Sequence, residues 1–182
     1  LSKRDFSRVI NPLKKFGAKF ESKKNKLPLV IKGLESPKSI NYIENRGSAQ
    51  VKSSVIFAAL KTNGTSTIKA KPSRSHSELL LKYLKVPIKV KRINNYDLIK
   101  VKGINKIQNL NYKIPGDISS CAFFIVLTVL SKNSELLIKN ININPSRTGI
   151  IEILKKMGAS IKMMNKKNYK GEKIADIRVK SS

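Results

Sequence analysis

The feature of this 182-residue chain that most constrains its fold is an internal repeat with a period of about seventy residues. One segment type recurs three times: an amphipathic helix with Leu or Ile at spacings of three and four, then a turn, then an alternating strand, at 10–20, 77–90 and 149–163. Gly17 and Gly158 stand at two of the helix ends, where a left-handed residue is common. The middle copy has Val86 and Pro87 there, so its helix must end differently.

A second kind of helix alternates with the first. Residues 48–70 and 117–140 each begin after a glycine, carry a run that is apolar nearly all round, and end in a polar turn and an alternating strand. A third element, a short alternating strand, recurs at 27–34, 97–104 and 175–182. The cyclic order is helix, strand, strand, strand, helix, strand. We therefore predict the α/β class, with repeated βαβαββ units, buried helices and outer mixed sheets; a repeat protein that binds no ligand is the alternative.

The formal net charge of +27 suggests a polyanionic partner, but the distribution of the charges argues against nucleic acid. Basic residues are spread along the whole chain, and arginine, which favours phosphate and base recognition, occurs only at positions 4, 8, 46, 74, 92, 147 and 178. Aromatic residues make up only 6%, which leaves few stacking surfaces for bases. Small anionic substrates fit the same charge, and a basic nucleic-acid-binding module remains the alternative.

The chain shows no pattern typical of a membrane protein. Its longest apolar run, residues 121–127, is far shorter than the roughly 20 residues of a transmembrane helix, and no signal peptide is recognisable. The single cysteine, Cys121, can form no internal disulfide. We expect a cytoplasmic protein. Because the first residue is Leu1 rather than Met, we also expect a piece of a longer chain.

The segment RGSAQVKSSVIFAAL, residues 46–60, joins a polar start to an apolar helix whose one charge is Lys52. Gly47 allows close approach of the backbone, and Ser48 suits the N-cap of a helix. The free N–H groups of a helix start also bind anions. Since capping and ligand binding are compatible, we predict that Ser48, Ala49 and Gln50 do both.

Five segments, in this order and spanning the chain, resemble landmarks of the 5-enolpyruvylshikimate-3-phosphate synthase family. They are LSKRDFSRVINPLKKFGA (1–18), GSAQVKSSVIFAAL (47–60), KPSRSHSELLL (71–81), IPGDISSCAFF (114–124) and NINPSRTGIIEILKKMGA (142–159). The resemblance implies an inside-out α/β barrel built from parts of two domains. It also implies transfer of the enolpyruvyl group of phosphoenolpyruvate to the 5-hydroxyl of shikimate-3-phosphate, with release of phosphate, by an enzyme that is monomeric and needs neither metal nor cofactor.

The same resemblance assigns substrate-binding residues. It implies that Ser48, Ala49, Gln50 and Arg74 bind shikimate-3-phosphate, and that Arg4 and Gln50 bind phosphoenolpyruvate. Arginine suits both positions because a guanidinium stays charged and grips carboxylate or phosphate with two parallel bonds.

The chain departs from the family pattern at two places beside these arginines. Asp5 stands where proline usually follows Arg4, so the carboxylate either pairs with Arg4 or turns away. Ser75 replaces an aspartate after Arg74. These departures leave a sister enolpyruvyl transferase, acting on another substrate, as an alternative. His76, the single histidine, is interpreted as structural.

Asp117 is expected to cap a helix, and Arg147 to tie a loop to a helix. The family's catalytic carboxylates and lysine would lie outside these 182 residues, so we expect no catalytic residue in this fragment and no turnover by it alone. The resemblance divides the chain into residues 1–115, part of the shikimate-3-phosphate-binding domain, and residues 116–182, the start of a second domain.

Overall fold

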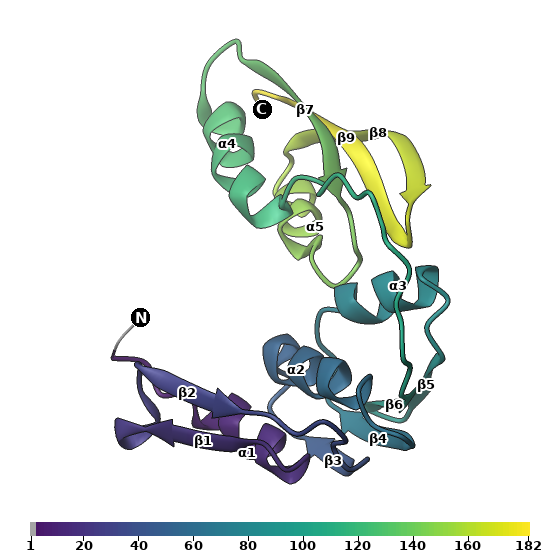
Figure 1. The fold of residues 1–182 in the computed structure, drawn as a ribbon. Helices are drawn as coiled ribbons and strands as arrows, with labels where there is room; N and C mark the ends of the chain where they lie inside the picture. Colours follow the sequence, from purple (N-terminus) through teal and green to yellow (C-terminus); the bar gives the residue numbers. More distant parts are fainter. Residues whose placement is uncertain (1–2) are drawn as a thin grey trace. The chain divides into compact units, whose positions relative to one another are not determined.

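The computed structural model describes residues 3–182, which form two compact units that divide between Gln108 and Asn109 (Figure 1). This division lies a few residues before the expected boundary after Pro115. The assignment of the two units to substrate-binding domains stays a prediction.

The first unit contains two sheets and three α-helices. Its elements are α1 (Ser7–Lys15), β1 (Lys19–Ser22), a 3-10 turn η1 (Lys23–Asn25), β2 (Leu29–Lys32), β3 (Asn41–Glu44), α2 (Ala49–Ala59), β4 (Thr65–Ala70), α3 (His76–Tyr83), β5 (Ile88–Ile93) and β6 (Tyr96–Lys102). Strands β1 and β2 pair antiparallel. The larger sheet has the order β3-β4-β6-β5, in which β3 is parallel to β4 and the other neighbours are antiparallel.

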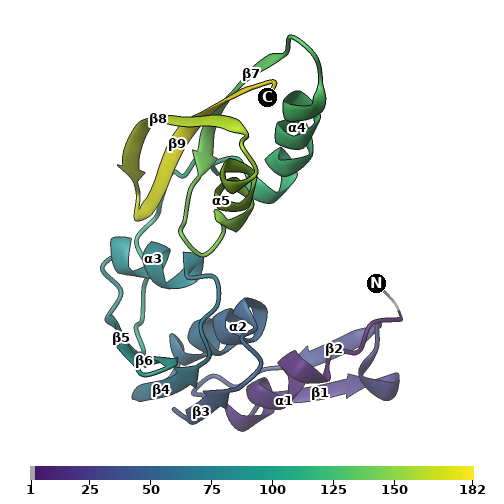
Figure 2. The same ribbon diagram turned by 180° about the vertical axis from the view of Figure 1, so that it is seen from behind.

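The second unit repeats this arrangement. It contains α4 (Ile118–Leu130), β7 (Glu135–Asn142), α5 (Gly149–Lys156), β8 (Ser160–Tyr169) and β9 (Glu172–Lys180), with the antiparallel order β7-β9-β8. A single parallel bridge joins Gly116 to Ile141 of β7, at the place that β3 takes beside β4. In both views α4 and α5 lie on the same face of this sheet (Figure 1, Figure 2). The order of helices and strands that the predicted repeat requires is thereby confirmed, with this bridge in place of a full strand.

Each unit has its own hydrophobic core between helices and sheet. In the first unit, α2 contributes Val55, Ile56 and Ala59, which pack with Ile68 of β4 and Ile99 of β6. Alternate residues of these strands point to the core, as the period of two predicts. In the second unit the buried cluster comprises Ile118, Cys121, Ile125, Ile141, Ile151, Leu154, Ile161, Ile177 and Val179.

The helix ends follow the sequence prediction. Gly17 after α1 and Gly158 after α5 have φ values of 103° and 94°, in the left-handed region. In the middle copy, Lys85 takes this conformation with a φ of 57°, without a glycine.

Helix α4 departs from the expectation of burial on all sides. One face packs on β7 and β9, through residues such as Ile125, which is fully buried. The other face exposes Phe123, Phe124, Leu127 and Leu130, of which Phe123 is 79% exposed. Among residues 3–182, no element of the second unit covers this face, which is why a helix that is apolar all round is only half-buried within its own unit. Among these residues the sheets also do not close into a barrel.

Candidate functional site

The start of α2 is both a capped helix and a glycine turn. Ser48 is the N-cap, and its Oγ accepts a hydrogen bond from the backbone N–H of Val51 at 3.4 Å. Gly47 has a φ of 70°, which a residue with a side chain rarely adopts. The capping role predicted for Ser48 is confirmed.

A buried carboxylate that the sequence analysis did not consider, Glu44, occupies part of the same turn. Glu44 is 2% exposed, and its two oxygens accept the backbone N–H groups of Arg46 (2.9 Å), Gly47 (2.7 Å) and Ser48 (3.1 Å). An incoming anion therefore meets a turn whose first three donors are already taken. Among the described residues, the backbone N–H groups of Ala49 and Gln50 have no hydrogen-bond partner, so these two remain for a ligand.

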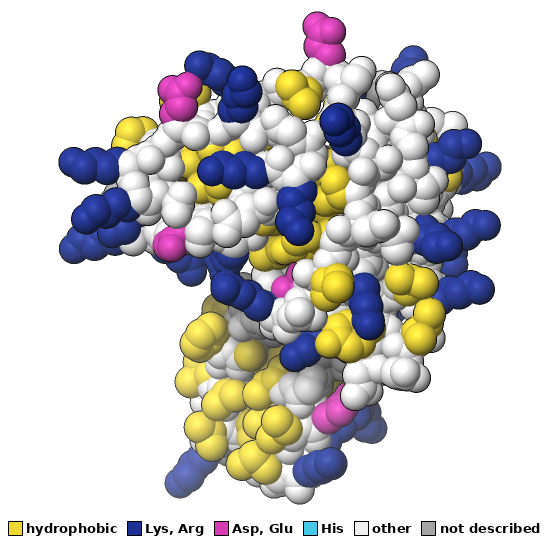
Figure 3. All heavy atoms as spheres, turned by 90° about the horizontal axis from the view of Figure 1, so that it is seen from below, with side chains coloured by type: hydrophobic (Ala, Val, Ile, Leu, Met, Phe, Trp, Pro, Cys, Tyr) yellow, Lys and Arg dark blue, Asp and Glu magenta, His cyan; other side chains and the backbone are white. Residues whose placement is uncertain are grey.

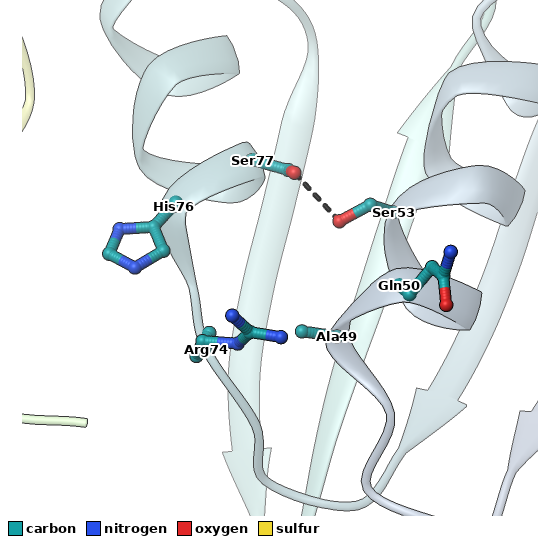
Figure 4. Close-up of a pocket in the computed structure, with 6 residues that line it drawn as sticks. All are labelled: Ala49, Gln50, Ser53, Arg74, His76 and Ser77. Carbon is teal, nitrogen blue, oxygen red and sulfur yellow. Dashed lines mark hydrogen bonds between the residues drawn. The ribbon is translucent and has the colours of Figure 1, made fainter. Parts of the chain in front are cut away.

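A pocket of about 200 Å³ opens beside this helix start (Figure 4). Its lining comes from α2, from the segment before α3 and from the first turn of α3: Ala49, Gln50, Ser53, Arg74, His76 and Ser77. The Arg74 side chain points toward Ala49, whereas the amide of Gln50 lies on the side turned away from Arg74 (Figure 4). Three residues assigned to shikimate-3-phosphate thus share one pocket. Ser48 lies at its edge as the cap and does not line it.

Two further features next to the pocket escaped the sequence analysis. Lys52 Nζ forms a buried ion pair with Glu78 Oε1 at 2.6 Å, between α2 and α3. Ser73 Oγ, one residue before Arg74, is buried and has no hydrogen-bond partner among the described residues. The signal for the ion pair was present in the sequence, since Lys52 is the one charged residue of an otherwise apolar helix.

Arg4 is exposed and does not line this pocket. Asp5 Oδ1 accepts the backbone N–H of Ser7, the first residue of α1, at 2.6 Å, and this hydrogen bond lowers the pKa of Asp5. Of the two possibilities left open, Asp5 therefore turns to the helix start. The structure does not bring Arg4 together with Gln50 and Arg74, and its role stays a prediction.

In the second unit, Asp117 and Arg147 have the structural roles that we expected. Asp117 is the N-cap of α4 and accepts the N–H of Ser119 at 3.1 Å. Arg147 donates to Asp117 Oδ1 at 3.2 Å and to Ser119 Oγ at 2.5 Å, which ties the loop before α5 to α4. Cys121 is buried, and its burial raises the pKa of the thiol.

Neither a metal cluster nor a membrane-spanning helix is found in the part of the chain that the structure describes. No group of three or more His, Cys, Asp or Glu side chains lies close enough to hold a metal ion. No helix there is long and apolar enough to cross a membrane.

The fold is that of the enolpyruvyl transferases. The enolpyruvyl transferase NikO from Streptomyces tendae matches the whole chain and 43% of its own length with a TM-score of 0.68; at 12% identity this shows the fold alone. A solved EPSP synthase from Acinetobacter baumannii matches the whole chain and 41% of its own length, with a TM-score of 0.83 and 37% identity.

The family model of EPSP synthase (3-phosphoshikimate 1-carboxyvinyltransferase) matches residues 1–181, and the chain belongs to this family. Among curated relatives, the 3-phosphoshikimate 1-carboxyvinyltransferase of Caldicellulosiruptor saccharolyticus is 46% identical and that of Endomicrobium trichonymphae 43% identical, each over the whole of this chain. The chain spans 42% of the length of these relatives.

Proposed function

We propose that this chain supplies the shikimate-3-phosphate-binding part of an enzyme that transfers the enolpyruvyl group of phosphoenolpyruvate to the 5-hydroxyl of that substrate. The observation that carries the proposal is the single pocket shared by Arg74 and the N-terminus of α2. Arg74 supplies a permanent positive charge, and the N–H groups of Ala49 and Gln50 supply donors at the positive end of a helix. These are the groups that a phosphate ester needs.

The proposed division of labour between the substrates follows from the same geometry. Arg74 points across the pocket and is the group that we assign to the phosphate of shikimate-3-phosphate (Figure 4). Gln50 is turned away from Arg74, so its amide is the group that we assign to the boundary with phosphoenolpyruvate. Arg4 remains the family-based assignment for phosphoenolpyruvate.

We also propose that the enzyme is cytoplasmic and monomeric and acts on small anions rather than on nucleic acid. On the face that Figure 3 shows, Lys and Arg side chains are scattered and do not gather into one continuous stripe. A stripe of this kind is what a nucleic-acid backbone requires.

The test is isothermal titration calorimetry of the 182-residue chain with shikimate-3-phosphate. Arg74→Ala removes a charge-assisted contact that contributes about 1.5–3 kcal/mol, so affinity should fall about ten-fold or more. Arg8→Ala, which removes an equal charge from an exposed position of α1, is the matched control and should bind like the wild type. Equal affinities of the two variants would show that the pocket is not the phosphate site.

A further inference from the structure

Two contacts join α2 to α3 immediately next to the pocket. The fully buried Lys52 Nζ lies 2.6 Å from Oε1 of Glu78, which is 6% exposed. The hydroxyls of Ser53 and Ser77 are hydrogen-bonded at 2.7 Å (Figure 4). Consecutive residues of one helix thus meet consecutive residues of the other, and the serine pair is part of the pocket lining.

A contribution to the stability of the fold does not explain well why this ion pair is present. Removing two charges from water is costly, and the attraction between them offsets the cost only when further hydrogen bonds satisfy both groups. Here Glu78 Oε2 is buried and has no hydrogen-bond partner among the described residues. Well-packed apolar side chains at such positions often give equal or higher stability. A charged pair at this place therefore suggests a requirement other than stability.

The pair lies close, along both segments of the chain, to the groups that we assign to the ligand. Lys52 is three residues after Ala49 on α2, and Glu78 lies in the first turn of α3, which begins two residues after Arg74. Ala49 and Lys52, three residues apart on one helix, lie on the same side of α2, and Glu78 fixes the first turn of α3, directly after the segment that carries Arg74. The separation of Lys52 and Glu78 therefore sets the separation of the N-terminus of α2 from the segment that carries Arg74.

We propose that Lys52 and Glu78 are a positioning pair, which holds the Arg74 guanidinium at the distance from the α2 N-terminus that a bound phosphate requires. This inference rests on the proposed binding of shikimate-3-phosphate at this pocket. Neither Lys52 nor Glu78 touches the ligand. Their contribution is to keep the two anion-binding groups from separating or closing on each other when the pocket is empty.

The decisive variant is the double substitution Lys52→Met with Glu78→Leu, which removes both charges together and leaves neither partner buried alone. Its unfolding midpoint in urea should be equal to or above that of the wild type. Its affinity for shikimate-3-phosphate, measured by calorimetry on the 182-residue chain, should nevertheless fall about ten-fold. Arg74→Ala should then add less than a two-fold loss in this background, against a ten-fold loss in the wild type, because Arg74 is already misplaced.

Two results would overturn the positioning role. One is that Arg74→Ala lowers the affinity by the same factor in the double variant as in the wild type, and the other is that the double variant binds with unchanged affinity. A second readout does not depend on the ligand: the NMR resonance of the Arg74 Nε–H group, with that of Arg8 as reference. It should shift or broaden in the double variant, and an unchanged resonance would overturn the inference by itself. If the resonance changes but Arg74→Ala has no effect on binding in the wild type, the proposed function fails and the positioning survives.

Discussion

At the scale of single residues, the repeat places two glycines in equivalent positions with unequal surroundings. Gly33 follows β2, and Gly103 follows β6. A Cβ added to Gly33 would meet nothing within 4 Å, whereas a Cβ added to Gly103 would lie 1.6 Å from the backbone oxygen of Thr62. Of the two, only Gly103 therefore lies in a close backbone contact. Its N–H also donates to the backbone oxygen of Gly64 at 3.1 Å, in the same turn as Thr62.

We predict that Gly103→Ala destabilises the chain by about 1–3 kcal/mol or more, because the backbone must move to admit the methyl group. Gly33→Ala should change the free energy of unfolding by less than about 0.5 kcal/mol. Urea denaturation of both variants measures the difference. A similar effect of the two substitutions would show that the approach of Gly103 to Thr62 is relaxed in solution.

Glu44 matters at this scale because its carboxylate holds the turn before α2. Replacing it with Gln keeps its size but presents an amide N–H₂ group to backbone donors. Because hydrogen bonds to a charged acceptor contribute about 1.5–3 kcal/mol, Glu44→Gln should destabilise the chain by an amount of that order. The control is Glu21→Gln, which removes an ion pair with Lys32 whose side chains are 65% exposed and should have an effect below about 1 kcal/mol. Thermal unfolding compares the two, and a negligible effect at Glu44 would contradict its role in holding the turn.

At the scale of elements, Asp176 on the central strand β9 accepts hydrogen bonds from the places where both neighbouring strands shift register. Strand β7 shifts register between Ile138 and Ile141, and β8 between Met164 and Lys167. Asp176 accepts the backbone N–H of Asn140 in the first irregularity and the side-chain amide of Asn165 in the second, both at 2.8 Å. Both asparagines have a positive φ, as extra residues in a strand often do.

These hydrogen bonds lower the pKa of Asp176 below its ordinary value, and the bond from the Asn165 side chain has a larger effect than the bond from the Asn140 backbone. A carboxyl whose pKa is lower in the folded state stabilises the fold above its unfolded pKa, and this stabilisation is lost as the pH falls through the folded pKa. We predict that Asp176→Asn is less stable than the wild type near pH 6, and that the difference shrinks below about pH 4. Urea unfolding at both pH values measures it; a constant difference would contradict the linkage.

The sequence predicted the elements well because the apolar spacing of each helix and strand recurs with the repeat. It could not show that the Glu44 carboxylate accepts the N–H of Gly47, since this depends on where the end of β3 lies relative to the turn. Nor could it show that Lys52 meets Glu78, because the pair joins two helices through tertiary packing. The resemblance assigns Arg74 and Gln50 to one substrate, and both line one pocket, but their binding of that substrate stays a prediction. Arg4, assigned by the same resemblance, does not line this pocket.

At the scale of the whole molecule, the candidate pocket offers groups suited to an anion but few suited to proton transfer. The whole sequence has eleven acidic residues, and the pocket lining contains no carboxylate. The two buried carboxylates nearest to it are already engaged, Glu44 by backbone N–H groups and Glu78 by Lys52. General acid–base catalysis of enolpyruvyl transfer needs groups placed to give and take protons at the reacting carbon and hydroxyl. Such groups would have to come from the part of the family fold beyond these 182 residues.

We therefore predict that the 182-residue chain binds shikimate-3-phosphate but releases no phosphate from the two substrates above the uncatalysed rate. A chimera in which this chain replaces the matching 42% of the Caldicellulosiruptor saccharolyticus enzyme should restore turnover, because the relative supplies the missing catalytic groups. Arg74→Ala in that chimera should raise KM for shikimate-3-phosphate about ten-fold or more, as expected for a lost contact to the phosphate. A phosphate-release assay on all three proteins distinguishes the cases. Turnover by the isolated chain would show that its own side chains, with His76 the first to test, carry the proton transfers.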